Sequence, residues 1–453
     1  EGPWLTFARM ETLRSPKQLL GPAFGVPSLT FQAWYRARFG AAAWDDLYRI
    51  PRPMWMDYLR WYRDVLQIPV ENGVRVMRVD PRPDGLFSLS IDGQPARLSR
   101  KIVLATGRDG LGGPTIPGFM DGIERHRLWA HSADAVDFAA LRGKRVVVIG
   151  SGATAATLIP AIAEDAKHVT MLQRSPTFFI SRPKVAELAA QLRALEIPDE
   201  WTHEIMRRAS FKQGEELWRM SIDSPDVLRE YLIGEMRPQL PEGFDIDKHF
   251  NPTYRPWQQR LAAVPEGDLF TALREGRASV VTDTIERFTP TGILLASGEE
   301  LEADIVVTAT GFDLSLFGNV AFTVDGEPVD FTQQVTYRGI MITGVPNMAY
   351  VFGYFRASWT LRADLVSQFV CRLLTKMDEQ GTPVVVPQLR PEDEGMPLLD
   401  WSDPENFNPG YVMRSQHRMF KRGDREPWTH HKEYSEERAI LPTADLDDGL
   451  VYR

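Results

Sequence analysis

Cysteine is nearly absent from this chain of 453 residues, in which Cys371 is the single one. A lone thiol excludes an internal disulfide, a thiolate metal cluster and the paired cysteines of a disulfide reductase. Such sparse use of cysteine is typical of a reducing compartment, so we expect a cytoplasmic protein. We also expect no metal site, because His430 and His431 have no further ligands at a defined spacing.

Long apolar runs and an excess of one charge are absent as well. No uninterrupted apolar stretch approaches the ~18 residues of a membrane-spanning helix, and no charged-then-apolar leader is found. The 52 basic and 61 acidic residues leave a net charge of -9, so we expect no nucleic-acid partner and no stable membrane insertion. Residues 1–70 are rich in aromatics and arginine but only slightly basic. This favours core packing and the wall of a cofactor site over stacking on nucleic acid.

Residues 144–176 do contain the pattern of a strand, a glycine-rich turn and a helix. Arg145 to Ile149 has the apolar run of a buried strand, and helical periodicity starts directly after the turn. The first glycine of such a turn permits the bend, the second lets the backbone approach a pyrophosphate, and a small third residue lets helix and strand pack closely. Phosphates would bind at the helix N-terminus. The expected nucleotide-binding residues are Gly150, Ser151, Gly152, Ala153, Thr154 and Ala155.

A second apolar strand, His168 to Leu172, follows at the spacing of a β-α-β unit. NAD-preferring enzymes commonly end this strand with an acidic residue for the ribose 2'-hydroxyl, whereas this chain continues Gln173-Arg174-Ser175. The Arg174 guanidinium can hold a 2'-phosphate in a charge-assisted pair of about 1.5–3 kcal/mol, so we expect NADPH at Arg174 and Ser175. The alternative is a plain parallel strand that ends in a solvated arginine. Pro160 is expected to bend the helix of this unit.

An apolar strand that ends in Ala-Thr-Gly occurs twice, as RKIVLATG at 100–107 and DIVVTATG at 304–311. We interpret each as a place where the chain crosses between two dinucleotide-binding domains, one inserted in the other. The other predicted elements are an amphipathic helix at 54–66, a β-meander at 74–79 and 86–91, a mainly helical region at 183–276, strands at 279–295 and 301–308 with a turn at Ser297-Gly298, and a Pro-rich wrapping tail after 380.

Several of these segments together resemble the class B flavin monooxygenases. The motifs are VVVIGSGATA (146–155), MLQRSP (171–176), the repeated Ala-Thr-Gly and TATGFDLSLFG (308–318). Residues from about 140 to 435 look most like the ethionamide-activating branch of the Baeyer-Villiger monooxygenases. That likeness is carried by LPEGFDIDKHF (240–250), YRPWQQRLAAVPEGDLF (254–270), VTDTIERFTPTGI (281–293) and GVPNMAYVFGYFRASWTLRADLVSQFVCRLL (344–374). Residues 1–140 look more like the flavin-domain remainder of other members of the wider family.

The resemblance implies an α/β two-dinucleotide-binding-domain flavoprotein, with a Rossmann-type NADPH domain inserted in an incomplete FAD domain. The implied ranges are 1–118 and 304–380 for the two parts of the FAD domain, 119–303 for the NADPH-binding domain with a helical insertion, and 381–453 for a C-terminal wrapping extension. The implied reaction uses FAD, NADPH and O2. NADPH reduces the flavin, O2 adds at flavin C4a, and the peroxide oxygenates a small ketone, as in a Baeyer-Villiger reaction, or a soft heteroatom such as that of a thioether.

The resemblance also assigns roles to residues. Arg260 aligns with the arginine beside the flavin, where a fixed positive charge in a dry site stabilises the anion formed during oxygenation. The alternative for Arg260 is a structural ion pair. Ser358 is a good N-cap for a helix from about Trp359 onward, whose free N–H groups would face flavin N1 and the C2 carbonyl; the alternative is an ordinary capped core helix. Further cofactor contacts are expected at Gln259, Thr310, Gly311, Trp359 and Thr360.

The sequence departs from the family in two places. Of the fingerprint Phe-x-Gly-x-x-x-His-x-x-x-Trp it keeps only His131, 19 residues before Gly150. His131 is thus a candidate catalytic residue at the domain junction, or else an ordinary junction or surface histidine. No Gly-x-Gly-x-x-Gly turn after a strand precedes residue 140, although such a turn holds the FAD pyrophosphate in this family. We therefore expect that the chain, which begins with Glu1, is a piece lacking roughly its first hundred residues.

Three functions fit these observations. The leading one is an FAD- and NADPH-dependent monooxygenase of the Baeyer-Villiger type. An enzyme alternative is a flavin monooxygenase that hydroxylates nitrogen or sulfur without forming an ester. An alternative from another class is a flavin-free NADPH-binding fragment without turnover.

The missing upstream turn generates a first prediction, which concerns bound flavin. The 453-residue chain should purify with little FAD, because backbone N–H groups at a glycine-rich turn provide much of a dinucleotide's anchoring. A visible absorption spectrum of the purified protein measures this directly. Stoichiometric flavin in that spectrum would contradict the expectation.

Overall fold

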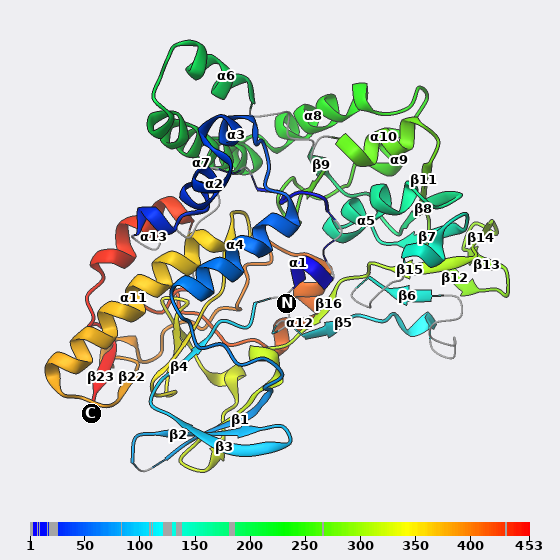
Figure 1. The fold of residues 1–453 in the computed structure, drawn as a ribbon. Coiled ribbons are helices and arrows are strands. Elements are labelled where there is room, and N and C mark those ends of the chain that lie inside the picture. Colours follow the sequence, from blue (N-terminus) through cyan, green and yellow to red (C-terminus); the bar gives the residue numbers. More distant parts are fainter. Residues whose placement is uncertain are drawn as a thin grey trace. The chain divides into compact units, whose positions relative to one another are not determined.

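The computed structural model describes residues 3–6, 8, 10–15, 17, 26–82, 84–107, 110, 112–120, 129–132, 138–180, 186–264, 267–430 and 433–453. The chain divides into two compact units, each of which is described by itself (Figure 1). Unit 1 comprises Glu1–Leu20, Phe31–Val65 and Pro114–Gly311, and unit 2 comprises Gly21–Thr30, Leu66–Gly113 and Phe312–Arg453. The second Ala-Thr-Gly motif ends where unit 1 ends, whereas the first lies within unit 2. The four domain ranges expected from the sequence stay a prediction.

A five-stranded parallel sheet forms the centre of unit 1. Its order is β11 (Ala278–Thr282), β8 (His168–Gln173), β7 (Arg145–Ile149), β15 (Ile305–Thr308) and β6 (Trp129–His131). Val146 and Val148 of β7 pack with helix α5 (Ala153–Ala163) in one apolar cluster. The predicted strand, turn, helix and second strand are therefore confirmed, and α5 continues through Pro160 to its end.

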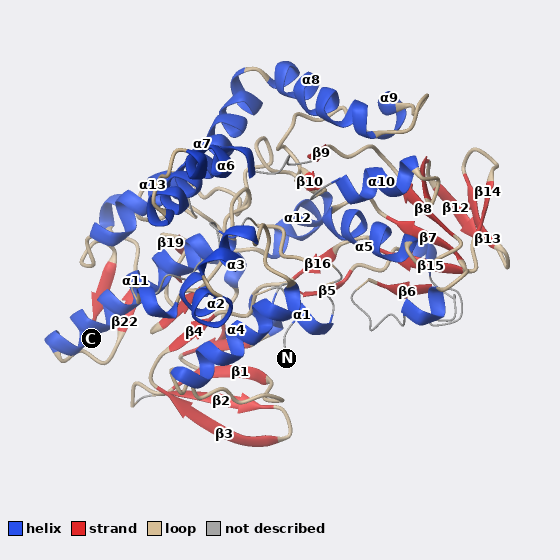
Figure 2. Ribbon diagram, turned by 45° about the horizontal axis from the view of Figure 1, so that its top comes forward, coloured by secondary structure: helices blue, strands red, loops and turns tan. Residues whose placement is uncertain are grey.

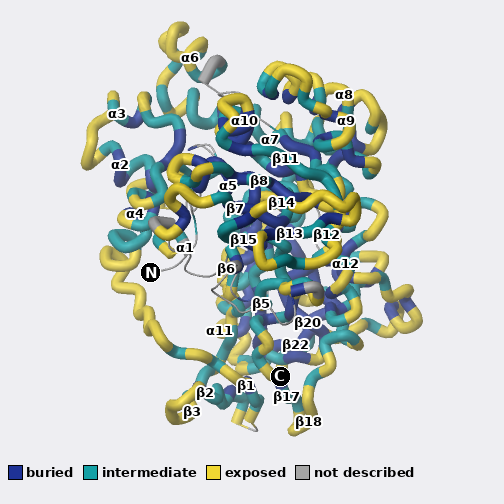
Figure 3. Tube along the Cα trace, turned by 90° about the vertical axis from the view of Figure 1, so that its right-hand side faces the viewer, coloured by how far each residue is buried: buried dark blue, intermediate teal, exposed yellow. Residues whose placement is uncertain are grey.

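The other face of the β7 strand contacts a small antiparallel sheet. Val147 and Ile149 share a cluster with Ile293 and Leu295, which lie in the middle strand of that sheet. Its strands are β12 (Ile285–Phe288), β13 (Gly292–Leu295) and β14 (Glu300–Glu302). Because both faces are covered, β7 reads as a continuous apolar run, and its trace is buried in Figure 3. The predicted turn at Ser297-Gly298 is confirmed by the bond from the Gly298 N–H to the Leu295 carbonyl, 2.9 Å.

Most described residues of the region predicted to be mainly helical, 183–276, do lie in helices, which Figure 2 draws in blue, with loops and one short strand between them. The helices are α6 (Ala186–Ala194), α7 (Asp199–Asp223), α8 (Pro225–Met236), α9 (Ile246–His249) and α10 (Asp268–Arg274). A short parallel strand pair is formed by β9 (Phe179–Ile180), which precedes α6 in the chain, and β10 (Ala262–Ala263), which lies between α9 and α10. Phe178 and Leu261, each beside one of these two strands, share a cluster with Leu228 and Leu232 of α8.

Aromatic residues near the N-terminus form a core of their own in unit 1. They lie on α2 (Phe31–Phe39), α3 (Ala41–Asp46) and α4 (Arg52–Val65), which follow α1 (Pro3–Thr6). The buried members are Leu13, Phe31, Trp34, Tyr35, Trp44, Ile50, Trp55 and Tyr58. The predicted amphipathic helix at 54–66 corresponds to α4. The expectation that these aromatics pack in a core is confirmed.

Unit 2 contains one larger sheet and several strand pairs. The sheet order is β18 (Glu327–Pro328), β17 (Ala321–Val324), β1 (Val76–Pro81), β2 (Phe87–Ile91) and β3 (Gln94–Ser99), which confirms the predicted meander. The pairs are β4 (Ile102–Leu104) with β21 (Met348–Tyr350), β5 (Gly112–Pro114) with β16 (Phe312–Leu314), β19 (Thr336–Tyr337) with β20 (Met341–Ile342), and β22 (Val385–Pro387) with β23 (Leu450–Tyr452). The first Ala-Thr-Gly strand is thus β4, parallel to β21.

The long helix α11 (Trp359–Gln380) and the C-terminal residues complete unit 2, together with α12 (Gly410–Ser415) and α13 (Tyr434–Ile440). Leu365, Val366 and Phe369 of α11 share a cluster with Trp428 and Leu441. Residues after 380 therefore supply core side chains and do not merely cover the surface.

A buried ion pair joins α11 to α13. Arg362 is fully buried and donates to both Glu437 carboxylate oxygens, from Nε at 2.9 Å and from Nη2 at 3.1 Å. Its remaining donors reach the carbonyls of Arg338, Gly339 and Phe352. The Tyr354 hydroxyl donates to Glu437 at 2.6 Å. Because each partner is fully bonded, removing one leaves an uncompensated buried charge.

The Glu437→Ala variant should therefore lose about 3–5 kcal/mol of unfolding free energy. Tyr354→Phe is the matched control, because it removes one hydrogen bond and leaves the ion pair, at a cost of about 1–3 kcal/mol. Urea unfolding of the three proteins gives the comparison. Equal losses in the two variants would show that the Arg362–Glu437 pair adds nothing beyond a hydrogen bond.

Candidate functional site

The turn after β7 contacts the ends of the two neighbouring strands, β8 and β15. Gly150 has a φ of +125°, and its N–H donates to the Leu172 carbonyl at 2.8 Å. A Cβ at Gly150 would lie 2.5 Å from the carbonyl oxygen of Ala309, which directly follows β15. Both the positive φ and this close approach require glycine. The start of α5 is thereby fixed relative to the sheet.

Gly152, in contrast, has room around it. It is the N-cap of α5 with extended backbone angles, and no described atom lies within 4 Å of where its Cβ would be. Helix α5 has no side-chain cap and no acidic residue in its first turn, so its N-terminal N–H groups keep their partial positive charge. Space beside Gly152 and uncompensated N–H groups fit the pyrophosphate of a dinucleotide.

The other residues of the turn are placed as the sequence predicts. Ala153 and Thr154 are exposed in the first turn of α5, whereas Ala155 is fully buried against the sheet. The Ser151 hydroxyl lies 2.7 Å from that of Thr177. That contact joins the turn to the segment after β8.

The end of β8 presents an exposed cation. Arg174 and Ser175 follow Gln173, the last residue of β8, and both are exposed. Within the described part of the chain, Arg174 has no acidic partner that would neutralise it. This placement at the carboxyl end of the strand beside β7 is where a Rossmann domain binds the adenosine ribose.

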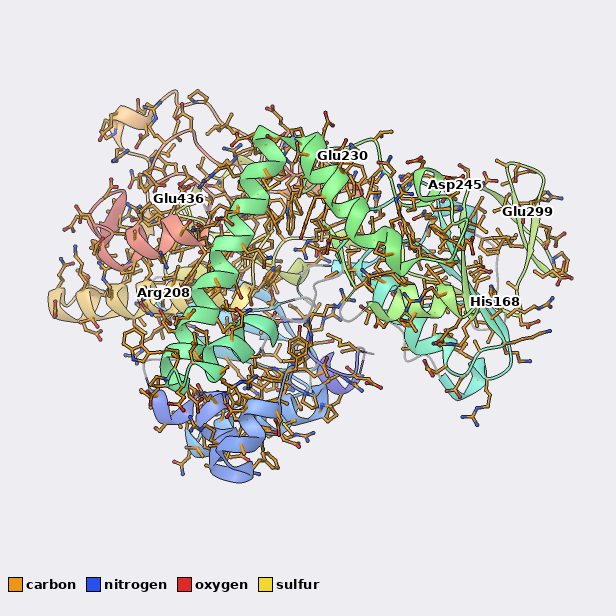
Figure 4. The ribbon with its side chains drawn as sticks, turned by 90° about the horizontal axis from the view of Figure 1, so that it is seen from above. His168, Arg208, Glu230, Asp245, Glu299 and Glu436 are labelled. Atoms are coloured by element: carbon orange, nitrogen blue, oxygen red, sulfur yellow. The ribbon has the colours of Figure 1, made fainter. Side chains whose placement is uncertain are left out.

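A polar cluster around the buried Gln173 supports this strand end, and the sequence pattern did not reveal it. The Gln173 amide donates to the His249 carbonyl at 2.6 Å and to the Thr282 hydroxyl at 2.8 Å, and Nδ1 of His249 lies 2.7 Å from the same hydroxyl. The short helix α9 that carries His249 is capped by Asp245, labelled in Figure 4, which accepts from the Lys248 N–H. The polar residue at the end of an otherwise apolar strand was the available signal.

Arg260 lies in unit 1, two residues before β10. Its side chain is exposed, and Gln259 beside it is half-buried. No acidic residue in the described ranges forms an ion pair with Arg260, so the structural ion-pair alternative has no support there. With respect to the described residues, the exposed Arg260 guanidinium can meet a ligand or a developing charge.

His131 and the second Ala-Thr-Gly motif lie at the same edge of the sheet. His131 ends β6, is 1% exposed and is in register with Thr308 of β15, so it is not a surface histidine. The Thr310 hydroxyl donates to the Thr115 carbonyl at 2.6 Å, and the Gly311 carbonyl accepts from the Thr115 N–H at 2.9 Å. Thr310 and Gly311 therefore join the end of the second Ala-Thr-Gly motif to the chain at Thr115.

In unit 2 the predicted helix start and the predicted N-cap residue are both confirmed. Ser358 is the N-cap of α11, yet its hydroxyl contacts the Thr360 hydroxyl at 2.9 Å instead of a backbone N–H. The first turn of α11 carries no acidic residue. The ring of Trp359 packs on Phe352, with centroids 4.8 Å apart. The Leu361 N–H donates to the Ser358 carbonyl at 3.3 Å, whereas the N–H groups of Trp359 and Thr360 have no partner among the described residues.

The structure also bears on a metal site and on a membrane-spanning helix, for the described residues alone. Among them no group of three or more His, Cys, Asp or Glu side chains could hold a metal ion. His430 packs among aromatic rings, including Trp401 at 5.2 Å, and His431 lies outside the described residues. None of the described helices combines the length and apolarity needed to cross a bilayer.

Comparison with known proteins identifies the family. The chain is 45% identical over 342 residues to the FAD-containing monooxygenase EthA of Mycolicibacterium smegmatis, an alignment that covers 75% of this chain and 67% of that protein. The chain belongs to the class B flavin monooxygenases. Its resemblance to this family, inferred from the motifs above, is confirmed.

Other class B relatives match over a smaller share of their length. EthA of Mycobacterium tuberculosis is 47% identical over 317 residues, which are 68% of this chain and 62% of that protein. The chain thus spans less than two thirds of several curated relatives that it matches. A family model described as L-lysine 6-monooxygenase/L-ornithine 5-monooxygenase matches residues 36–195.

Solved structures show the same fold at low sequence identity. OTEMO in complex with FAD and NADP has a TM-score of 0.71 at 18% identity, covering 100% of this chain and 93% of that one. An oxidized steroid monooxygenase bound to NADP has a TM-score of 0.72 at 19% identity, covering 100% and 92%. The predicted fold class, an α/β flavoprotein with two dinucleotide-binding domains, is confirmed.

The exposed cation at the end of β8 generates a prediction on nucleotide choice. The protein should bind NADP+ roughly 30-fold more tightly than NAD+, the equivalent of about 2 kcal/mol for one charged pair, and Arg174→Ala should erase most of this preference. Calorimetric titration with each nucleotide measures it. Arg208→Ala is the control, because Arg208 is an exposed arginine of the same unit that pairs with Glu204 on α7 (Figure 4). Equal affinities in the unmutated protein would contradict the prediction.

Proposed function

We propose that this chain acts as an FAD- and NADPH-dependent monooxygenase that inserts one oxygen atom from O2 into a ketone, in a Baeyer-Villiger reaction, or into a soft heteroatom. The observation that carries the proposal is the turn at Gly150–Gly152 with the exposed Arg174 at the neighbouring strand end, in a chain of this family. The two resembling structures were solved with NADP bound, one of them also with FAD.

The residues of unit 1 fit NADPH in three respects. Space beside Gly152 admits a pyrophosphate, the first turn of α5 supplies uncompensated N–H groups, and Arg174 supplies a charge for a 2'-phosphate. The Gln173 bonds to His249 and Thr282 hold the strand end that carries Arg174. Each contact binds or orients the nucleotide.

The residues of unit 2 fit one end of FAD. At the first turn of α11, Ser358 does not cap the backbone, so the N–H groups beside Trp359 and Thr360 can stabilise negative charge on the flavin ring at N1 and the C2 carbonyl. FAD bound there would carry electrons from NADPH to O2. Among the described residues no second strand, glycine turn and helix accompanies α11, so the FAD pyrophosphate has no counterpart of the Gly150 turn.

Arg260 is our candidate for stabilising the negative charge that develops during oxygenation. It is a permanently charged side chain without an acidic partner among the described residues. A preorganised charge at the position where negative charge develops is commonly the largest single contribution to catalysis. His131, fully buried at the end of β6, would act by positioning the residues around that strand end.

A second candidate function is hydroxylation of nitrogen or sulfur. It is favoured by the match of residues 36–195 to the lysine and ornithine monooxygenase model. The two functions differ in the protonation of the oxygenating species, because a carbonyl is attacked by an anionic nucleophile whereas a thioether or amine is itself the nucleophile. Incubation with cyclohexanone, methyl phenyl sulfide and L-ornithine distinguishes them through the lactone, the sulfoxide or the hydroxylamine. Formation of none of these products by the flavin-loaded enzyme would contradict both.

Replacing Arg260 gives a sharper test of the proposed chemistry. In the flavin-loaded protein, Arg260→Ala should lower product formation roughly 100- to 1000-fold, in line with the loss of one preorganised charge partner. NADPH should still be consumed, with hydrogen peroxide released instead of product. The measurement is product formed per NADPH oxidised.

A matched control separates this role from a structural one. Arg255, five residues earlier, donates to the carbonyl and the hydroxyl of Ser221 on α7. Arg255→Ala should therefore lower the melting temperature without changing the product formed per NADPH. An Arg260→Ala enzyme that still couples NADPH oxidation to product would remove Arg260 from the mechanism.

A further inference from the structure

An arginine from the N-terminal segment reaches the turn that precedes α5. Nη2 of Arg14 donates to the carbonyl of Ala153, the first residue of α5, at 2.9 Å. The two residues are 139 positions apart in the chain and both belong to unit 1. Arg14 belongs to none of the motifs in the sequence.

The backbone of this segment is held firmly from the other side. The Leu13 N–H donates to the Ile50 carbonyl at 2.8 Å, and residues 12 and 51 form an isolated antiparallel bridge. The buried Arg49 side chain donates to the carbonyl of Arg14 itself. The backbone that carries Arg14 is therefore fixed by hydrogen bonds, and this fixes the position from which its side chain reaches α5.

The charge of Arg14 is placed where a helix does not favour it. A cation beside the N-terminal turn opposes the positive end of the helix dipole, an effect of about 0.3–1 kcal/mol at exposed sites. The first turn of α5 contains no acidic residue that would offset it. Burial also lowers the pKa of the Arg14 guanidinium, while Asp268 raises it. An anion bound at this turn would offset both the Arg14 charge and the positive end of the helix dipole.

The donors of Arg14 can serve that anion. A guanidinium carries five N–H donors in a planar fork that matches phosphate oxygens. Among the described residues, the side chain of Arg14 donates only to the Ala153 carbonyl. The Ala153 carbonyl that Arg14 contacts belongs to the first turn of α5, whose N-cap is Gly152, so the remaining donors are carried by a side chain that is already anchored at this turn.

We propose that Arg14 binds the pyrophosphate of the nicotinamide nucleotide, as a second cation distinct from Arg174. This inference rests on the proposed binding of NADPH at the Gly150 turn. It differs from the role of Arg174 in a measurable way. The pyrophosphate is common to NADP+ and NAD+, whereas the 2'-phosphate belongs to NADP+ alone.

The two cations should therefore give different patterns of nucleotide affinity. In calorimetric titrations of the full chain, Arg14→Ala should weaken NADP+ and NAD+ binding by the same factor, roughly tenfold to a hundredfold for one charge-assisted bond. Arg174→Ala should weaken NADP+ alone. Arg14→Lys keeps the charge but not the fork, so it should recover part of the loss for both nucleotides.

A control variant tests whether Arg14 acts only through folding. Arg52 also belongs to the N-terminal part of unit 1, and its side chain donates to the Trp4 carbonyl at 2.6 Å. Arg52→Ala should leave both affinities unchanged. If Arg52→Ala and Arg14→Ala lower the melting temperature of the nucleotide-free protein and weaken binding equally, Arg14 is structural and the inference is overturned.

The remaining outcomes separate this inference from the proposed function. Tight, NADP+-selective binding that Arg14→Ala leaves unchanged overturns the role of Arg14 while the proposed function stands. Weakening of NADP+ alone by Arg14→Ala would place Arg14 at the 2'-phosphate and also overturns the inference. Binding of neither nucleotide by the unmutated protein overturns both proposals.

Discussion

The close approach of Gly150 to the carbonyl of Ala309 is the constraint on which the nucleotide site depends. A Cβ at Gly150 would lie 2.5 Å from that oxygen, so only glycine lets the turn after β7 come this near to the end of β15. The contact determines where α5 starts. It therefore also determines where the free N–H groups of the first turn lie, and where Arg14 meets the Ala153 carbonyl.

Positive charge without a local acidic partner is a feature that the proposed cofactor-binding residues of each unit share. Arg174 and Arg260 are exposed and lack acidic partners in the described part of the chain, and the helices α5 and α11 begin without an acidic residue. Buried Arg362, by contrast, has its charge compensated by Glu437. The difference separates residues that maintain the fold from residues available to an anionic cofactor.

Much of the fold was predictable because its signals are local. The apolar run at β7, the glycine turn, the second strand and α4 all follow from residues next to one another. Ser358 was correctly predicted as an N-cap residue, but the partner of its hydroxyl was not predictable, because a serine at an N-cap can bond either to the backbone or to a neighbouring hydroxyl. In this chain Thr360 supplies that hydroxyl, and the choice depends on geometry that the sequence pattern does not contain.

The sequence by itself determined the family, the α/β class and the residues of the Gly150 turn, because these depend on spacing along the chain. The tertiary structure alone decided which distant residues meet. The contact of Arg14 with Ala153, the Gln173–His249–Thr282 cluster and the Arg362–Glu437 pair join positions from 33 to 139 residues apart. Such contacts depend on how helices and strands pack against one another in the folded chain. The periodicity of a local segment does not contain that information.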